Sequence, residues 1–369
     1  MKVLVTGANG FVGKNLVIKL KEKSIDYATL SHTAGTAEIN TKVKECDFLV
    51  HLAGVNRPEN DAEFAAGNRG FTEKLCEAIT ATGAKAKVIY SSSIHADRDS
   101  AYGISKREAE QALEQLSQTN GNQVLNIRLP NLFGKWCRPN YNSVVATFCY
   151  NVANNLPISV ADENIELTLC YIDDVVDHIV QLLESNPDFS TGSFNAVSPQ
   201  YHVTLGKLVE LLYAFKNSRE NITSEKVGVG FTRALYSTYI SYFEPEQFSY
   251  SLTEHRDERG VFVEMLRTQD SGQFSFFTAK PGITRGGHYH HTKNEKFLVL
   301  KGTARFGFRH IITGETYVLE TSDRHYQVVE TVPGWSHDIT NIGDEELVVM
   351  LWANELFDPE NPDTIAHKV

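Results

Sequence analysis

Cysteine is scarce in this 369-residue sequence, which contains five. No two of them follow a CxxC spacing, and none lies beyond residue 170. Their odd number and wide spacing argue against a disulfide framework and against a thiolate metal site. We therefore expect buried free thiols at all five positions, which are Cys46, Cys76, Cys137, Cys149 and Cys170.

Long apolar runs and an excess of positive charge are also missing. No run approaches the 18 or more residues of a membrane span, and Met1–Val5 leads into the next residues without a signal-peptide core. Lys and Arg number 35 against 46 Asp and Glu, and the net charge of −11 argues against general affinity for nucleic acid or an anionic membrane. We expect a cytoplasmic protein with neither partner.

Apolar residues make up 41% of the chain, and their pattern changes along it. Up to about residue 240, short apolar runs alternate with amphipathic stretches, which is the βαβ rhythm of a parallel sheet covered by helices. After about residue 245, strands separated by Gly and Asp turns predict an antiparallel sandwich or barrel. The sequence thus predicts an α/β Rossmann domain over residues 1–245 and an all-β domain over residues 246–369.

A glycine-rich turn, Thr6–Gly13, follows the first predicted strand and opens the first helix. Glycines at such a turn let a pyrophosphate approach the helix N-terminus, where unpaired N–H groups and the helix dipole favour an anion. Spaced glycines alone would also suit any tight turn, so the prediction depends on this strand-to-helix context. The predicted dinucleotide-binding residues of the turn are Gly7, Asn9, Gly10, Phe11, Val12 and Gly13.

A tyrosine and a lysine four residues apart, Tyr102 and Lys106, share one face of a predicted helix. An ammonium beside a phenol lowers the phenol's pKa from about 10, which makes proton donation feasible near neutrality. The serine run Ser91–Ser93 ends an apolar strand just before this helix, and a serine hydroxyl can hold a substrate carbonyl in line. An exposed helix that happens to carry this pair is the alternative.

Over roughly residues 1–240 the chain resembles the extended short-chain dehydrogenase/reductases that act on nucleotide sugars. Besides the glycine turn and the Tyr/Lys pair, the resemblance rests on Asp47–Gly54, Asn68, Arg128–Gly134 and Tyr171–Val175. It implies that Tyr102 is the proton donor and that Lys106 binds the nicotinamide ribose. It also implies that Ser92 or Ser93 holds the carbonyl, and the short spacing to Tyr102 leaves both open. The further cofactor-binding residues that it implies are Leu52, Ala53 and Gly54.

The end of the second predicted strand bears on the choice of cofactor. An enzyme that uses NAD usually has a carboxylate there, which binds the ribose 2′-OH and would repel a 2′-phosphate. This sequence has Ser31 and His32 instead, and Lys14 lies just inside the first helix. The pattern favours NADP(H).

Three histidines and a glutamate in the second half follow a spacing typical of metal sites. His288 and His290 alternate on a predicted strand and so share a face, whereas His291 points away and is expected at the surface. Glu295 follows, and His337 could contribute from a facing strand. Imidazoles and a carboxylate suit zinc, iron, nickel or manganese, and without a nearby thiolate the site can keep an open position for substrate.

This histidine signature resembles the cupin superfamily over about residues 245–369, which implies a jelly-roll domain. Within cupins, His255–Glu264 and Arg285–Tyr289 look like the 3,5-epimerases of deoxysugar nucleotides. In those enzymes the histidine that matches His288 acts as a base and no metal is needed. His288 is therefore open as a ligand, a base or both, and Zn²⁺ is the leading ion, with other divalent metals as alternatives.

A short-chain reductase fused to such a cupin resembles the bifunctional enzymes of capsular-polysaccharide precursor synthesis. The resemblance implies a UDP-linked 4-keto-6-deoxy-N-acetylhexosamine, inverted at C3 by the cupin and reduced at C4 by the Rossmann domain. The expected product is UDP-N-acetyl-6-deoxy-L-talosamine. Cupin sandwiches often form dimers, so a homodimer is expected by analogy.

Two other functions stay open from the sequence. One is a monofunctional UDP-4-ketosugar reductase whose cupin only holds the structure or the dimer together. The other is a non-catalytic NADP-binding sensor, as occurs among Rossmann proteins that lose the catalytic pair. Tyr102 and Lys106 are both present here, which counts against a sensor.

Overall fold

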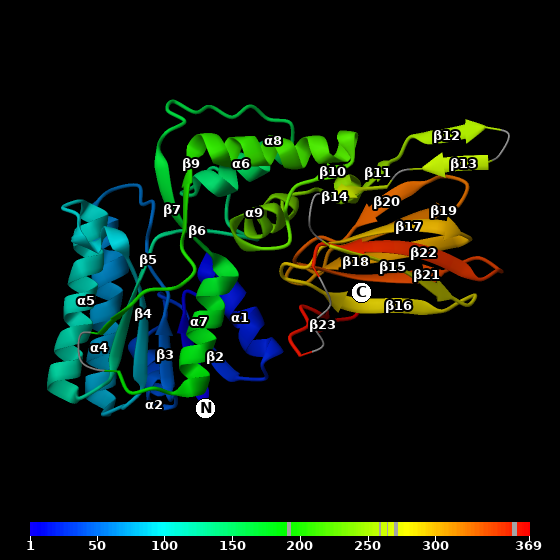
Figure 1. Cartoon of the computed structure of the whole chain (residues 1–369). Coiled ribbons are helices and arrows are strands. Elements are labelled where there is room, and N and C mark those ends of the chain that lie inside the picture. Colours follow the sequence, from blue (N-terminus) through cyan, green and yellow to red (C-terminus); the bar gives the residue numbers. More distant parts are fainter. Residues whose placement is uncertain (190–192, 258–259, 264, 269–271, 356–359) are drawn as a thin grey trace. The chain divides into compact units, whose positions relative to one another are not determined.

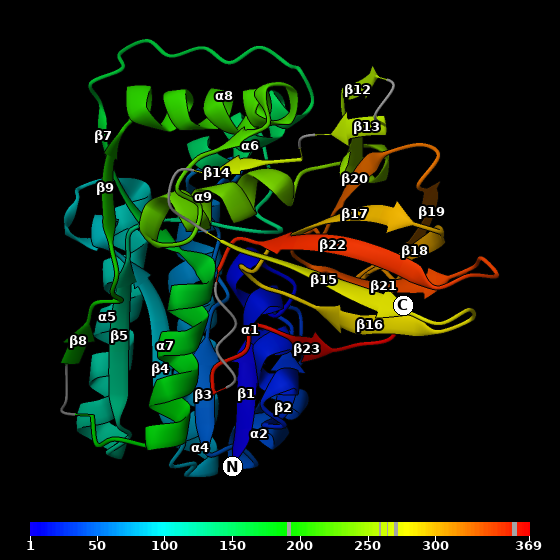
Figure 2. The same cartoon turned by 45° about the vertical axis from the view of Figure 1, so that its right-hand side comes forward.

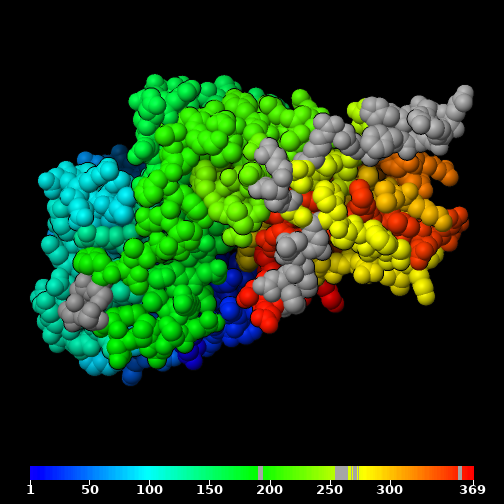
Figure 3. Space-filling model, in the orientation of Figure 1, coloured from blue at the N-terminus to red at the C-terminus, as the bar shows by residue number. Residues whose placement is uncertain are grey.

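The computed structural model describes residues 1–189, 193–257, 260–263, 265–268, 272–355 and 360–369 (Figure 1). The chain divides into two compact units, which are described here one at a time. The first unit holds Met1–Phe133, Asn140–Ser143 and Leu167–Val203, and the second holds Gly134–Pro139, Val144–Glu166 and Thr204–Val369. Figure 3 gives the space-filling view. Among the described residues, no helix has the length and apolar character needed to cross a membrane.

A six-stranded parallel sheet forms the centre of the first unit, with strand order β2-β1-β3-β4-β5-β8. Its strands are β1 (Lys2–Thr6), β2 (Asp26–Leu30), β3 (Phe48–His51), β4 (Lys87–Ser93), β5 (Val124–Leu129) and β8 (Ser193–Asn195). Because β1 lies between β2 and β3, the strand order reverses there. Ligands of Rossmann folds bind at this kind of switch point, outside the carboxyl ends of the strands.

Helices cover both faces of the sheet (Figure 2). They are α1 (Phe11–Glu22), α2 (Thr36–Lys44), α3 (Ala62–Phe64), α4 (Phe71–Thr82), α5 (Ala101–Asn120) and α7 (Ile172–Ser185), with a π-helical turn at Ala65–Gly70 and a 3₁₀ turn at Ile94–Asp97. α1 packs against α7, while α4 packs against α2 and α5. A second, three-stranded sheet has the order β6 (Asn131–Phe133), β7 (Glu166–Tyr171) and β9 (Tyr201–Thr204). The predicted Rossmann architecture is confirmed.

The core of this unit follows from its near-continuous apolar strands. Leu4, Leu49 and Val88 from three neighbouring strands pack with Leu75 of α4 and Leu113 of α5, and each is at most 1% exposed. Strands buried on both faces read as runs of apolar residues, which is the pattern seen in the sequence.

The start of α5 is fixed by a cap. The Oγ of Ser100 accepts the backbone N–H of Gly103 at 3.1 Å, and the helix ends at Gly121, whose φ of +75° favours glycine. The cap sets the first turn of α5, which carries Tyr102.

Two five-stranded antiparallel sheets form a sandwich in the second unit, with orders β11-β20-β17-β22-β15 and β19-β18-β21-β16-β23. The first contains β11 (Ser249–Ser251), β15 (Gln273–Ala279), β17 (Glu295–Lys301), β20 (Gln327–Glu330) and β22 (Leu347–Ala353). The second contains β16 (Thr284–Tyr289), β18 (Thr303–His310), β19 (Thr316–Ser322), β21 (Trp335–Asn341) and β23 (Ile365–Ala366). Two short pairs join β10 (Thr223–Ser224) to β14 (Arg267–Thr268) and β12 (Glu254–Asp257) to β13 (Gly260–Val263). The predicted jelly-roll class is confirmed.

Three helices belong to the same unit as this sandwich: α6 (Val144–Ala153), α8 (Leu205–Asn221) and α9 (Gly230–Ile240). A buried ionic cluster ties two of them to it. Glu330 at the end of β20 accepts from Arg219 of α8 at 2.9 Å and from the hydroxyl of Tyr236 of α9 at 3.3 Å, and it also pairs with Lys296. The domain division at residues 245/246 stays a prediction. The compact units are divided differently, and they group α8 and α9 with the sandwich.

All five cysteines carry free thiols, as expected. Four are buried and Cys76 is partly buried. The segment His255–Glu264, which carried part of the epimerase resemblance, lies partly outside the described residues, at Glu258, Arg259 and Glu264.

Candidate functional sites

The glycine turn lies at the switch point of the first unit. Gly7 has a φ of +70°, and a Cβ there would come within 2.6 Å of the Ala53 nitrogen at the end of β3. A Cβ on Gly13 would come within 2.1 Å of the Gly7 carbonyl oxygen. Both positions therefore require glycine. The turn brings the predicted residues Gly7–Gly13 beside Leu52–Gly54, as a nucleotide site at this edge would need.

The N-terminus of α1 is open to an anion. Gly10 is the cap residue and offers no side chain to the first N–H groups, and the first turn has no acidic residue. Thr6 of β1 pairs with Leu30 of β2, so Ser31 and His32 follow beside this turn, and both are exposed. The Ser31 hydroxyl lies 2.8 Å from that of Thr33. No carboxylate stands at the end of β2, in agreement with the sequence pattern.

A buried histidine supports the turn from behind. Thr6 Oγ1 accepts the N–H groups of Leu52 and Ala53 at 3.2 Å, so its own proton points to His51 Nδ1 at 2.7 Å. His51 Nε2 then donates to Thr72 at 2.9 Å. Burial, with a smaller contribution from the Lys106 charge, lowers the pKa of His51 to about 3, which keeps this relay neutral.

Tyr102 and Lys106 lie in the first two turns of α5, as predicted, but the lysine does not act on the phenol in the expected way. Lys106 is 5% exposed, its Nζ donates to the Ser91 carbonyl at 2.9 Å, and it lies over the ring of Tyr90. Burial lowers the pKa of Lys106 to about 8. Burial also raises the pKa of Tyr102, and a hydrogen bond with Ser93 opposes this only in part. The expected lowering of the Tyr102 pKa is therefore wrong, because burial of the phenol raises it and the Lys106 ammonium bonds to the Ser91 carbonyl instead.

The two candidate serines have different partners. Ser93 interacts with Tyr102 and also accepts the N–H of His95 at 3.1 Å. Ser92 instead donates to Glu110 at 2.5 Å, and Glu110 is held by the guanidinium of Arg128 at 2.7 and 2.9 Å. Ser93 thus lies in the Tyr102 group, and Ser92 belongs to a buried ionic group behind it.

The histidine cup of the second unit forms where β16 and β21 pair. His288 of β16 stands directly opposite His337 of β21, and paired residues of antiparallel strands point to one face. The register shifts between Gly286 and His288, which makes Gly287 the extra residue of a bulge. The φ angles of these two glycines are +96° and +78°. Without the bulge, Ser336 would take the place opposite His288.

The other two cup residues complete the cluster from the loop after β16 and from the facing sheet. Glu295 begins β17, and its Oε2 lies 3.2 Å from His290 Nε2 and 3.4 Å from His337 Nε2. One donor atom from each of the four residues lies within 4.8 Å of the others. His288 is half-buried while the other three are at most 7% exposed, so His288 lines the accessible side.

The charge state of the cup suits a cation. Burial lowers the pKa of His288 to about 3, helped by His337 and His290, and burial also lowers the pKa of His337. Burial alone would raise the pKa of Glu295, but its hydrogen bonds with His290 and His337 outweigh this and hold the pKa well below its usual range. Neutral imidazoles and an ionised carboxylate are the ligand-competent forms, so the four residues fit a divalent cation.

His291 lies outside the cup, as predicted, but it is 9% exposed and not at the surface. Its ring packs edge-on against Tyr289, with ring centroids 5.6 Å apart. No sequence pattern pointed to the supporting residues Thr72 and Glu110. Thr72 contacts His51, 21 positions away, and Glu110 contacts Ser92, 18 positions away.

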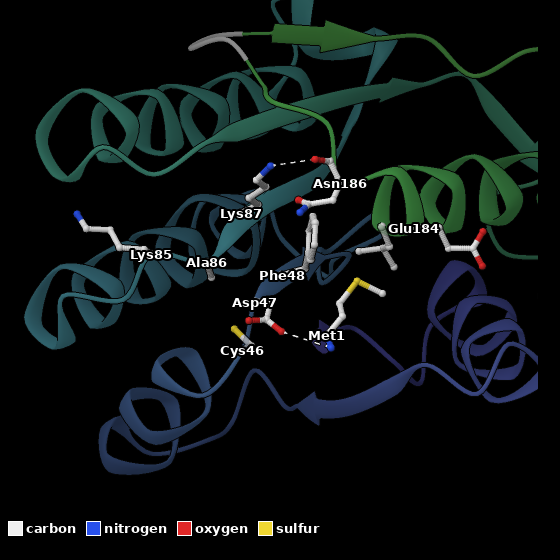
Figure 4. Close-up of a pocket in the computed structure, with 10 residues that line it drawn as sticks. Met1, Cys46, Asp47, Phe48, Lys85, Ala86, Lys87, Glu184 and Asn186 are labelled. Atoms are coloured by element: carbon white, nitrogen blue, oxygen red, sulfur yellow. Dashed lines mark hydrogen bonds and ion pairs between the residues drawn. The ribbon is translucent and has the colours of Figure 1, made fainter.

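A separate cavity of about 650 Å³ opens at the amino ends of β3 and β4 in the first unit (Figure 4). Its charged lining is largely paired: the Met1 amino group lies 3.8 Å from Asp47, and Lys87 donates to the Pro187 carbonyl at 2.7 Å. None of the predicted site residues lines it. It lies at the opposite end of the strands from the glycine turn.

Two family models match the chain. The NAD dependent epimerase/dehydratase family covers residues 3–196, and the polysaccharide biosynthesis C-terminal domain covers residues 255–365. The chain belongs to the NAD dependent epimerase/dehydratase family, which implies use of NAD(P).

Full-length relatives extend the likeness over both units. The UDP-2-acetamido-2,6-beta-L-arabino-hexul-4-ose reductase of Pseudomonas aeruginosa is 53% identical and covers 100% of this chain and 99% of its own length. The crystal structure of the capsular polysaccharide assembling protein CapF from Staphylococcus aureus is 43% identical, with a TM-score of 0.67 and 100% coverage of both chains. A UDP-glucose 4-epimerase from Thermus thermophilus, 21% identical with a TM-score of 0.51, covers 59% of this chain and 84% of its own and supports the fold alone. The resemblance to the enzymes of capsular-polysaccharide synthesis is confirmed.

Proposed function

We propose that the chain is a bifunctional nucleotide-sugar enzyme of capsular-polysaccharide precursor synthesis. Its cupin epimerises C3 of a UDP-4-keto-6-deoxy-N-acetylhexosamine, and its Rossmann unit reduces the C4 ketone to give UDP-N-acetyl-6-deoxy-L-talosamine. The grouping of Tyr102, Ser93 and Lys106 beside a glycine turn carries the reductive assignment. The Pseudomonas relative, which is named as a UDP-hexulose reductase, supports the substrate class.

NADPH, held at the Gly7–Gly13 turn, would supply the hydride for the reduction at C4. The Tyr102 hydroxyl donates its proton to the ketone oxygen, and its raised pKa keeps that proton in place until charge develops there. Ser93 hydrogen-bonds to the same oxygen and aligns it with Tyr102. Lys106, which donates to the Ser91 carbonyl in this structure, would bind the cofactor ribose.

In the epimerisation step, a cation held by His290, Glu295, His337 and, in its resting state, His288 would supply a Lewis acid that acidifies C3. The partly exposed His288, once released from the cation, would take the C3 proton, and a solvent proton added to the opposite face of C3 would complete the inversion. The donor set has three nitrogens, one carboxylate and no thiolate, which makes Zn²⁺ our first choice. Inversion must come first, since reduction removes the carbonyl that makes C3 acidic.

A monofunctional reductase with a structural cupin is the second candidate. The name of the Pseudomonas relative mentions a reductase alone, which favours this candidate. The two differ in one measurement. Incubating the enzyme with the ketosugar in D₂O without NADPH should give deuterium at C3 by NMR if the cupin is catalytic. A non-catalytic sensor would neither exchange C3 nor oxidise NADPH.

The serine assignment predicts a split between two neighbouring variants. Ser93→Ala should lower kcat for ketone reduction on the order of 10²-fold, because it removes a hydrogen bond to the developing alkoxide. Ser92→Ala should leave the kcat near wild type and lower the free energy of unfolding by about 1–3 kcal/mol, since Glu110 loses a buried partner. Steady-state kinetics with denaturant titrations check both. The reverse split would assign Ser92 to the substrate.

Cofactor choice follows from the exposed Ser31 and His32 at the end of β2. The ratio of kcat/KM values should favour NADPH over NADH. Ser31→Asp should erase or reverse this ratio, because the carboxylate repels a 2′-phosphate and accepts the 2′-OH of NADH. Ser31→Asn is the matched variant without charge and should keep the wild-type order. A wild-type preference for NADH would contradict the assignment.

Two further proposals rest on analogy. The enzyme forms a homodimer, which light scattering on the purified protein tests. It works in the cytoplasm, where UDP-sugars and NADPH are supplied.

A further inference from the structure

The C-terminal tail, residues 360–369, contacts the loop between two of the cup ligands. This ligand loop, residues 290–294, links His290 to Glu295. The carboxylate of Asp363 caps it: Oδ1 accepts the N–H of His291 at 2.9 Å, and Oδ2 accepts those of Thr292 at 2.6 Å and Lys293 at 2.7 Å. The N–H of His291 also reaches Oδ2 at 3.1 Å, and the Thr292 hydroxyl donates to Oδ2 at 3.2 Å. One side chain thus holds three consecutive backbone N–H groups of the loop.

The same residue also fixes the orientation of a ligand. The backbone carbonyl of Asp363 bonds to His290 Nδ1. A carbonyl accepts hydrogen bonds and cannot donate them, so Nδ1 carries a proton and Nε2 is the nitrogen left for the cup. That Nε2 is the atom 3.2 Å from Glu295. Carbonyl contacts of this kind fix the tautomer and direction of metal-binding histidines in general.

The remainder of the tail holds the strand that bears His288. Within β23, Ala366 pairs with His288 and Ile365 pairs with Tyr289. Beyond it, the N–H of His367 donates to the Gly287 carbonyl at 2.8 Å, next to the bulge. The tail therefore contacts the backbone of both elements that bring His288 and His290 together.

We propose that Asp363 is a positioning residue for the metal site: it clamps the ligand loop and sets the direction of His290 without touching the cation. The inference rests on the proposed function insofar as the cup must hold a cation. Glu295 and His290 lie at the two ends of the clamped loop, so releasing the loop frees two of the four ligands together. Metal affinity is thereby set by a residue about 70 positions away in the sequence.

The test compares three variants of the full chain by zinc affinity, measured by competition with a chromophoric chelator. Asp363→Asn keeps the size of the side chain but loses its charge and one acceptor, and it should weaken zinc binding about 10- to 100-fold. Asp363→Glu keeps the charge but moves it by one methylene group, and it should also weaken binding. Asp323→Asn is the control, because Asp323 caps the single N–H of Gly302 in a turn that carries no cup residue, and it should bind zinc as wild type does.

A second readout separates positioning from general loss of stability. At saturating Co²⁺, the visible absorption spectrum of Asp363→Asn should differ in band position and intensity from wild type, because the ligand geometry has changed. If the folded Asn variant bound zinc with wild-type affinity and gave an unchanged cobalt spectrum, the proposal would be overturned. Loss in the Asn variant with full retention in the Glu variant would also overturn it, by assigning the effect to charge alone. Circular dichroism establishes that each variant is folded.

The outcome is distinguishable from failure of the proposed function. If the wild-type protein binds zinc but does not exchange C3, the catalytic role of the cup fails while the positioning role of Asp363 is still measurable. If the wild-type protein binds no divalent metal, both fail together. NADPH oxidation with an already inverted ketosugar should be the same in all three variants, since the reductive residues belong to the other unit.

Discussion

Replacing Tyr102 by Phe should lower the rate of ketone reduction by roughly 10²- to 10⁴-fold, the usual contribution of a general acid. The variant loses the hydroxyl that interacts with Ser93 and keeps the ring that packs against Phe64, with centroids 5.6 Å apart. The helix cap and Lys106 are untouched, so NADPH should bind as before. Stopped-flow measurement of NADPH consumption, with fluorescence titration of the cofactor, gives both values.

The control for this change is Tyr213→Phe, which removes the hydroxyl of an exposed tyrosine on α8 and should leave turnover unchanged. C3 exchange should also persist in Tyr102→Phe, because the cup belongs to the other unit. Wild-type turnover in Tyr102→Phe would contradict the reductive half of the proposed function. Loss of NADPH binding would instead assign Tyr102 to the cofactor pocket.

Replacing His337 by Ala should abolish metal retention and, with it, deuterium uptake at C3. His337 is 2% exposed, stands opposite His288 and lies 3.4 Å from Glu295, so no other described residue can take its place in the cluster. Elemental analysis should show a zinc content far below one ion per chain, and NMR in D₂O should show little exchange. Reduction of an already inverted ketosugar should continue.

His325→Ala is the matched control, since His325 is exposed in the same unit and lies outside the cup. Binding of a metal to the folded state alone also stabilises that state, by about 4 kcal/mol at a thousandfold excess over Kd. The His337→Ala protein must therefore be shown to fold by circular dichroism. If a folded, metal-free variant exchanged C3 at the wild-type rate, the cation would be structural and His288 would act as a metal-independent base.

The parts of both sites that follow from local patterns could be predicted from the sequence. A glycine turn between a strand and a helix, a Tyr/Lys pair on one helical face, and alternating histidines on a strand each place side chains through backbone geometry alone. Gly7, Tyr102 and His288 accordingly lie where their patterns put them, whereas His290 lies one residue beyond the end of β16 and still joins the cup. The place of His337 depends on which strand pairs with β16, and no local pattern specifies that pairing.

The remainder depended on contacts between distant residues. Both Ser92 and Ser93 end β4, and the choice between them follows from Glu110, a full turn beyond Lys106, which accepts the Ser92 hydroxyl. The direction of the Tyr102 pKa follows from burial, which a sequence pattern does not reveal. Asp363 has no motif of its own, because its partners lie 70 to 73 positions away.

The glycine bulge in β16 bears on how such a metal site could be recognised or transplanted. On a regular strand, two alternating histidines share a face but meet whichever partner the register dictates, and here that partner would be Ser336. The extra residue shifts the pairing register of His288 by one residue, so the site depends on Gly286 and Gly287 as well as on the imidazoles. Transferring the four ligands to another sandwich would therefore require the same bulge in the ligand strand. In other sequences, a glycine pair before the histidines would distinguish strands that can complete such a metal site from strands on which two histidines only share a face.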